Sequence, residues 1–398
     1  MRVVMLLAAA CLAAPSASAQ GRLGTVEKRP KLAAGADTND ASPYFALGAR
    51  SLADRPDEAA AAFYWAARLD PSSAEALGGR RAALLMRKVP VLKLYMEGSR
   101  RARTSKELIA IDTMQLRALR LDPLYYRKYD WTMLMAYYRA VYRIDYPTAS
   151  VQNIDFAIRS DFDKASPYTR GWVAYSEGKM EDALEFYDLA MQRAKNTGYI
   201  RIERARALTM QGLFPRAIEE LRLASVDLKK LEADKEENVV FYNSSALVEH
   251  SVGVLYARIG QVDSAKAALG RAITEDLSYF AAHLELGRIA LAEKDTATAI
   301  SELGLAAELA VDEPWVHYLH GSTLLSAGQH ADAVVALKKA IDLEPLHAES
   351  HFALAQALEK NGDRPGALAA YTRYLVISPR RDQQRRSVAT ERAAGLRP

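Results

Sequence analysis

Histidine is the residue type in this chain whose placement comes closest to a metal-binding pattern. Two pairs, His317 with His320 and His347 with His351, are spaced so that each could supply two ligands. No third histidine or carboxylate follows at a matching spacing, so we predict no metal site. All seven histidines lie after residue 249: His250, His283, His317, His320, His330, His347 and His351.

A second histidine pattern has a long period. His283, His317 and His351 follow one another at intervals of 34 residues. Equivalent positions in neighbouring packed helices lie about 8–10 Å apart, whereas a zinc–nitrogen bond is about 2 Å long. The three side chains therefore cannot share one ion, and their spacing indicates a repeat instead.

Sequence patterns of known catalytic sites are absent. The chain has no His-Glu-x-x-His pair, no Gly-x-Ser-x-Gly elbow, no phosphate-binding loop and no Gly-x-Gly-x-x-Gly. Its single cysteine, Cys11, cannot form a zinc, iron–sulfur or haem attachment site. We therefore expect no catalytic residues and no cofactor, and a protein that is not an enzyme. A hydrolase with an unrecognised site in residues 75–163 remains as an alternative.

The 34-residue period extends to other residue types. Four units begin at Ala246, Phe280, Pro314 and Ala348. Each has a small residue at its eighth position, an alanine at its twentieth and a bulky apolar residue at its twenty-fourth. These are Gly253, Gly287, Gly321 and Ala355; Ala265, Ala299, Ala333 and Ala367; and Leu269, Leu303, Leu337 and Tyr371. Small residues allow two helices to cross closely, so each unit is predicted to be a helix pair.

Glycine marks where the first helix of each unit ends. Gly260, Gly328 and Gly362 stand at the fifteenth position, where glycine ends a helix, and Lys294 is the exception. The pattern resembles the tetratricopeptide repeat (TPR) family. That resemblance implies an all-α protein, a right-handed superhelical solenoid of stacked helix-turn-helix repeats, here with a more irregular α-helical N-terminal half.

The repeat register divides the chain into segments. We predict four TPR repeats at 246–381, a helical insertion at 232–245 and two further repeats at 164–231. Before them we predict degenerate helical repeats at 75–163, including a tyrosine-rich helix at about 124–143, and a TPR-like repeat at 41–74. A basic capping helix or tail is expected at 382–398.

The N-terminus has the features of a secretory signal peptide. Arg2 precedes the apolar run Val3–Leu12, and Ala17-Ser18-Ala19 is a small-residue cleavage site. We therefore expect a signal peptide at 1–19, a flexible leader at 20–40, and a periplasmic or secreted protein. Alanine and arginine usage suggests a bacterial chain, and lipidation at Cys11 remains an alternative. No later run is long enough to span a membrane.

Charge is nearly balanced overall, at +4. Nucleic acid is therefore not an expected partner. The segment Arg80–Lys106 carries nine basic residues against Glu97. We interpret it either as solvated helix faces or as a contact for an anionic envelope component, such as lipid headgroups.

The resemblance also implies where a partner binds. TPR repeats line a concave groove with defined positions of each first helix, and aromatic and arginine side chains are enriched at interaction hot spots. Here these positions hold Tyr168, Trp172, Tyr175, Tyr199, Arg206, Arg288, Trp315, Tyr318 and Phe352. The alternative is that the aromatic residues only fill space between repeats.

The residue types at these positions also limit the kind of partner. No lysine or asparagine occurs among them, so the carboxylate clamp of the family is not expected. We predict a non-enzymatic protein–protein interaction scaffold of the bacterial envelope that binds a peptide or helix. The alternative is a TPR subunit of an envelope assembly or polysaccharide export system.

Overall fold

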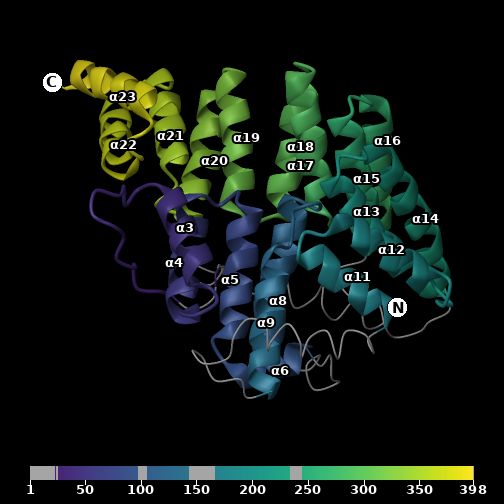
Figure 1. Cartoon of the computed structure of the whole chain (residues 1–398). Coiled ribbons are helices and arrows are strands. Elements are labelled where there is room, and N and C mark those ends of the chain that lie inside the picture. The colour runs from purple at the N-terminus through teal and green to yellow at the C-terminus, as the bar shows by residue number, and fades with distance from the viewer. Residues whose placement is uncertain (1–22, 24–25, 97–104, 143–165, 234–243, 398) are drawn as a thin grey trace.

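The computed structural model describes residues 23, 26–96, 105–142, 166–233 and 244–397 (Figure 1). Throughout these residues the regular secondary structure is α-helix, arranged as successive antiparallel pairs. The predicted signal peptide, 1–19, lies outside the described residues. None of the described helices is long and apolar enough to cross a membrane.

The C-terminal part is a stack of four helix pairs in the predicted register. They are α15 (Ser245–Arg258) with α16 (Val262–Glu275), α17 (Phe280–Ala292) with α18 (Thr296–Leu309), α19 (Pro314–Ser326) with α20 (His330–Leu343), and α21 (Ala348–Lys360) with α22 (Arg364–Ile377). A last helix, α23 (Gln383–Leu396), packs on α22 where the capping helix is predicted. The all-α solenoid expected from the sequence is confirmed.

Close helix crossing explains the repeat pattern. A Cβ atom added at Gly287 would lie 2.6 Å from Cγ of Leu303, and one at Gly253 or Gly321 would lie 2.7 Å from the matching leucine, Leu269 or Leu337. Such distances are about 1 Å shorter than a normal carbon–carbon contact. The eighth position is therefore small because the bulky twenty-fourth residue fills the space that a side chain would need.

Two more pairs precede this stack. They are α11 (Pro167–Ser176) with α12 (Met180–Met191), and α13 (Gly198–Met210) with α14 (Phe214–Ala233). Gly171 lies against Tyr187 as Gly287 does against Leu303. Helix α14 runs into the predicted insertion as far as Ala233, and α15 begins at Ser245. Residues 234–243 of that insertion lie outside the described residues.

The N-terminal half is less regular. Helices α3 (Ala41–Ser51) and α4 (Pro56–Leu69) form a pair in the predicted 41–74 unit, followed by α5 (Ala74–Met86), α6 (Val89–Met96), α8 (Lys106–Leu121) and α9 (Tyr129–Tyr142). Gly48 and Gly79 both face the ring of buried Phe63. The helix predicted at about 124–143 begins at Tyr129, because the residues before it form turns and contact other repeats.

This half folds back against the turns that join the C-terminal repeats (Figure 1). Arg117 forms an ion pair with Glu313 at 2.6 Å, and Arg68 forms one with Glu344 at 2.8 Å. The guanidinium of Arg120 lies 5.6 Å from the ring centre of Phe280. Both glutamates are buried, so removing either arginine would take away a counter-charge from a buried carboxylate. These contacts fix the two halves together.

Residues 26–40, expected to be a flexible leader, are instead held by the fold. Glu27 forms ion pairs with Arg80 at 2.8 Å and Arg87 at 2.9 Å, and its carbonyl accepts a hydrogen bond from Trp65. Further on, Asn39 donates to the carbonyl oxygen of Val376 at 2.8 Å, in the last repeat. The leader is ordered because the buried Arg80 needs a nearby carboxylate.

The same contacts correct the interpretation of Arg80–Lys106 as an open basic surface. Arg80 and Arg87 are paired with Glu27, Arg81 is paired with Asp112, and Lys88 with Glu107. Arg100, Arg101 and Arg103 lie outside the described residues. Within the described part, the basic excess of this segment is largely neutralised by acidic residues from elsewhere in the chain.

Candidate partner-binding groove

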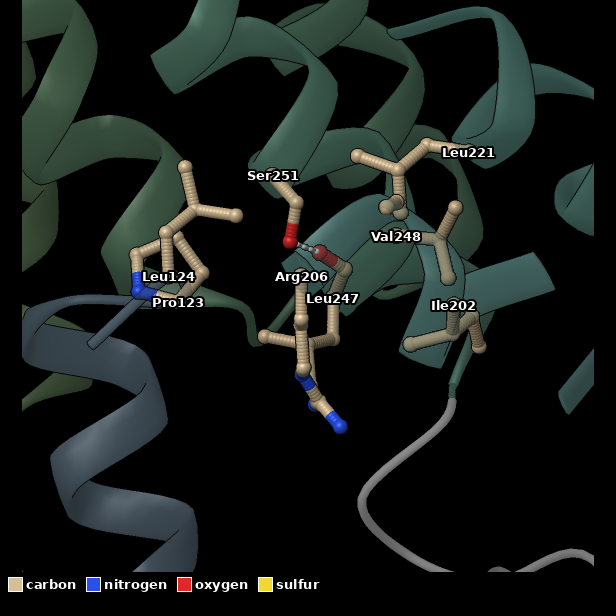
Figure 2. Close-up of a pocket in the computed structure, with 9 residues that line it drawn as sticks. Pro123, Leu124, Ile202, Arg206, Leu221, Leu247, Val248 and Ser251 are labelled. Atoms are coloured by element: carbon tan, nitrogen blue, oxygen red, sulfur yellow. Dashed lines mark hydrogen bonds between the residues drawn. The ribbon is translucent and has the colours of Figure 1, made fainter. Parts of the chain in front are cut away.

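The part of the groove formed by helices α11 to α15 is occupied by the protein's own chain. The α8–α9 linker, residues 122–128, crosses it without regular secondary structure and with a turn at Pro123 and Leu124. Pro123 and Leu124 lie among Ile202, Leu221, Leu247, Val248 and Arg206 (Figure 2). The cavity left between these side chains measures about 10 Å³, about the space of a single water molecule. The linker therefore fills this part of the groove.

Tyr126 of the linker contacts the predicted groove residue Tyr175 and its neighbour Ser176 directly. Its hydroxyl lies 3.2 Å from the carbonyl oxygen of Tyr175 and 3.3 Å from that of Ser176. The rings of Tyr126 and Tyr175 meet edge to face, with their centres 5.4 Å apart. Tyr175 is only 1% exposed, and it holds the linker.

An ion-pair network continues from the linker. Arg127 donates to Glu203 at 2.8 Å, and Arg206 donates to the other carboxylate oxygen at 2.6 Å. Burial alone would raise the pKa of Glu203, but the two guanidinium groups outweigh it and hold that pKa below its usual value. Trp172 donates its indole N–H to Asp130 at 3.4 Å. Glu203 is thus a buried anion shared by two arginines.

The sequence left two interpretations of the groove residues open, partner binding and packing. Tyr175 and Arg206 are buried and pack against the linker, and Trp172 is half-buried at its edge. Tyr168 is 39% exposed, with its ring 6.1 Å from that of Tyr187. Tyr199 is half-buried. A partner role for these five residues stays a prediction, since their surroundings are largely supplied by this chain.

The groove positions of the C-terminal repeats are more open. Trp315, Tyr318 and Phe352 are half-buried, and Arg288 is exposed and lies 3.3 Å from Glu285. The rings of Trp315 and Tyr318 have centres 5.4 Å apart and planes inclined by 33°. We call the surface formed by Arg288, Trp315, Tyr318, Glu349 and Phe352 the open groove.

Glu349 is the acidic residue of the open groove, and it occupies a groove position of the repeat that begins at Ala348. Its side chain is 35% exposed and lies 3.4 Å from Nε2 of His347. Burial raises the pKa of Glu349, and the negative charges of Asp70 and Asp382 raise it further, against the opposing effect of Arg385. The carboxylate thus lies in a partly dehydrated, acidic environment.

The linker, His347 and Asp70 were not identified as groove components from the sequence. The tyrosine-rich stretch after Pro123 was the available signal, but it predicted a helix rather than a linker with turns. His347 stands before the first helix of its unit, so the repeat positions of the family do not include it. Asp70 comes from a turn far away in the chain, which no periodicity links to the last repeats.

The histidines serve as packing and hydrogen-bonding residues. His250 is buried and lies 3.1 Å from the hydroxyl of Tyr279, and burial lowers the pKa of His250 to about 3. His283 lies 2.8 Å from Glu302, and His351 donates to the carbonyl of Pro345. Among the described residues, no three histidine, cysteine or acidic side chains are grouped as a metal site would require.

Comparison with known proteins identifies the repeats. The sequence profile of the tetratricopeptide repeat matches residues 253–313 and 318–382. The BBSome complex member bbs-4 of Caenorhabditis elegans is 26% identical over 213 residues, which are 52% of this chain and 44% of that protein. This chain therefore spans less than half the length of that relative.

Solved structures that resemble part of this chain include two that are described as TPR proteins. YrrB, described as a TPR protein with an unusual peptide-binding site, is 18% identical with a TM-score of 0.41, over 52% of this chain and all of that one. The C-terminal part of a TPR protein from Cytophaga hutchinsonii is 15% identical with a TM-score of 0.44, over 58% of this chain and 95% of that one. MamA is 22% identical with a TM-score of 0.37, over 45% of this chain and 91% of that one.

Proposed function

Because this chain is a tetratricopeptide repeat protein, we propose that it is an exported, non-enzymatic scaffold of the bacterial envelope. It holds a protein partner, as an extended peptide or a helix, along the open groove of its C-terminal repeats. The predicted signal peptide supports export. The aromatic and arginine side chains of the groove support a protein partner.

The observation that carries this proposal is the unequal filling of the groove. The α8–α9 linker occupies the repeats of α11–α14, where Tyr175 and Arg206 are buried. Trp315, Tyr318 and Phe352, at the second and fifth positions of later repeats, keep part of their surface exposed, as Tyr199 and Tyr168 do at those positions of the earlier repeats. A large aromatic side chain left partly exposed on a concave surface retains the contact area that a partner can bury.

Site-specific crosslinking in cells tests this proposal. A photoreactive phenylalanine analogue at Phe352 should give a discrete crosslinked protein, and Trp315→Ala should abolish that product. The same analogue at Val335, which is 70% exposed on α20, is the matched control and should give none. Equal crosslinking from Phe352 and Val335, or a product that survives Trp315→Ala, would show that the open groove does not hold the partner.

A second candidate function is supported by the inclined ring pair of Trp315 and Tyr318. Stacked aromatic rings also bind the apolar faces of sugars, as the alternative of a polysaccharide export or envelope assembly subunit requires. Binding of the purified protein to an array of envelope polysaccharides, lost in Trp315→Ala, would favour this candidate over the protein scaffold.

Export is tested separately. The N-terminal sequence of the protein recovered from the periplasm or medium should begin at Gln20, after Ala19. A product that starts with a lipid-modified Cys11 would support the lipoprotein alternative, and recovery of the uncleaved chain from the cytoplasm would contradict export. The basic segment Arg80–Lys106 adds no argument for an anionic envelope partner, since its buried arginines are already paired.

A further inference from the structure

We propose that the open groove contains a site for a cationic side chain, an arginine or lysine of an extended peptide, formed by Trp315, Tyr318 and Glu349. This inference rests on the proposed function and specifies the chemistry of the partner. It is carried by three features of the site: two aromatic rings held in place, an acidic group beside them, and no lysine or arginine of the described residues bound to either.

The two rings are fixed by their surroundings. Trp315 and Tyr318 lie one turn apart on α19, and the imidazole of His347 meets both edge to face, at 5.0 Å from Tyr318 and 6.4 Å from Trp315. His347 is itself held by Ser350, whose hydroxyl lies 2.7 Å from Nδ1. Binding a ligand against such rings requires little ordering of side chains.

Ring faces attract cations, and this protein already uses that contact. Arg29 lies 4.6 Å from the ring centre of Trp65, and Arg170 lies 4.2 Å from that of Phe186. No such contact is found at Trp315 or Tyr318 within the described part of the chain. Both rings are half-buried and keep part of their surface exposed.

The acidic group is Glu349, which follows at the first turn of α21. Its carboxylate lies 3.4 Å from Nε2 of His347. No lysine or arginine of the described residues forms an ion pair with Glu349. Arg385 is near, but it pairs with Asp382 at 3.6 Å. A partly dehydrated carboxylate without a strong counter-charge gains from an incoming guanidinium or ammonium group.

Together these groups favour a cation over other ligands. A guanidinium is planar, so it can stack on an aromatic ring while its edge donates to a carboxylate. An acidic peptide or a C-terminal carboxylate would instead meet the negative charges of Glu349, Asp70 and Asp382. Charge complementarity thus selects a basic segment as the occupant.

The test uses two peptides that differ only in charge. The whole mature protein is titrated into fluorescein-labelled Leu-Arg-Leu-Arg-Leu and into the same peptide with citrulline in place of arginine. Citrulline keeps the shape of arginine and removes its charge. We expect the arginine peptide to bind about tenfold more tightly or better. Equal binding of the two peptides, or no binding of either, would overturn the inference.

Variants assign the binding to this site. Glu349→Gln should weaken binding of the arginine peptide about tenfold, and Trp315→Leu should weaken it by a similar factor. Glu308→Gln, at an exposed acid on α18, is the matched control and should leave the dissociation constant within about twofold. Full affinity in Glu349→Gln would overturn the inference, and its circular dichroism spectrum checks that the variant is folded.

A measurement on the unmodified protein gives an independent check. Glu349 is faced by His347 beside it, Tyr318 on α19, Asp70 of the α4–α5 turn, and Asp382 and Arg385 at the start of α23. Protonation removes the charge that binds the peptide, so affinity should fall as the pH drops from 7 to 4. In Glu349→Gln this fall should be reduced. The same fall in both proteins would contradict the assignment.

Failure of this inference can be told apart from failure of the proposed function. If the arginine peptide does not bind but Trp315→Ala still abolishes the crosslinked protein in cells, the partner is not basic and the scaffold proposal stands. If the crosslinked protein survives Trp315→Ala, the proposed function fails as well. Binding of a neutral oligosaccharide such as maltohexaose in place of the arginine peptide would overturn the cation site.

Discussion

Replacing Gly287 by alanine tests the packing that builds the repeats. Gly287 lies in α17 and faces Leu303 of α18, which is fully buried. A Cβ atom there would lie 2.6 Å from Cγ and 2.7 Å from Cδ2 of Leu303, and 3.4 Å from the backbone nitrogen of the same residue. Because Leu303 is fully buried, either its side chain must shift within the core or the two helices must move apart.

The size of the effect follows from two opposing contributions. Overpacking a well-packed core by one carbon costs about 1–3 kcal/mol. Alanine in a helix interior is favoured over glycine by about 0.5–1 kcal/mol. We therefore expect Gly287→Ala to lower the free energy of unfolding by about 1–2 kcal/mol.

Gly270 provides the matched control. It lies in the middle of α16, it is exposed, and no atom lies within 4 Å of the position that its Cβ would take. The same glycine-to-alanine change should therefore stabilise the protein by about 0.5–1 kcal/mol. The two variants should shift the unfolding midpoint in opposite directions.

Urea unfolding followed by circular dichroism measures both variants. Because a stack of repeats need not unfold in one step, hydrogen exchange of the α17 and α18 amides shows whether the loss is local. The double variant Gly287→Ala with Leu303→Ala should show a favourable coupling, since the smaller partner removes the clash. If Gly287→Ala stabilised the protein as much as Gly270→Ala does, the close crossing of these helices would be refuted.

Three further predictions concern single residues. Lys294 has a left-handed backbone, with φ of 62°, so Lys294→Gly should stabilise the protein by about 1 kcal/mol in urea unfolding, whereas Lys294→Ala should not. Glu203→Gln leaves Arg127 and Arg206 as buried cations without a full counter-charge, so it should destabilise the protein by about 3–5 kcal/mol. Limited proteolysis should then cut the α8–α9 linker, and a variant that is as stable as the original protein and keeps its linker uncut would contradict the role of Glu203 in holding the linker. The pKa of His250 is lowered to about 3 by burial, while the unfolded chain takes up that proton near pH 6.5. The unfolded state therefore binds more protons between pH 6.5 and 3, so the free energy of unfolding should fall as the pH drops below 6.5, by up to about 1.4 kcal/mol per pH unit. His250→Gln should show a smaller fall in the urea midpoint over this range. An equal fall in both proteins would mean that other groups cause the pH dependence.

The repeat register could be predicted from the sequence because it is a local, recurring requirement. Helices α17, α19 and α21 begin at Phe280, Pro314 and Ala348, the first residues of the predicted units. Each unit must pair a small residue with a bulky one at a fixed distance along the chain, so the pattern is visible without any knowledge of the whole fold. At the fifteenth position, Lys294 keeps the left-handed turn that glycine forms in the neighbouring units.

The availability of the groove, by contrast, was decided by the tertiary structure. An aromatic residue at a groove position gives the same sequence pattern whether or not another segment of the folded chain covers it. Tyr175 is buried under Tyr126, a residue 49 positions away, and Trp315 remains half-exposed. The leader is likewise held by Arg80, whose buried charge gives no periodic signal.

The sequence by itself therefore determined the helix pairs, since each depends on residues within one 34-residue unit. The tertiary structure decided how the two halves meet, because those contacts join residues such as Arg68 and Glu344 across 276 positions. A buried ion pair requires that both partners lose water and meet at one point in space. Only the folded chain specifies that point, and with it the part of the groove that is left open.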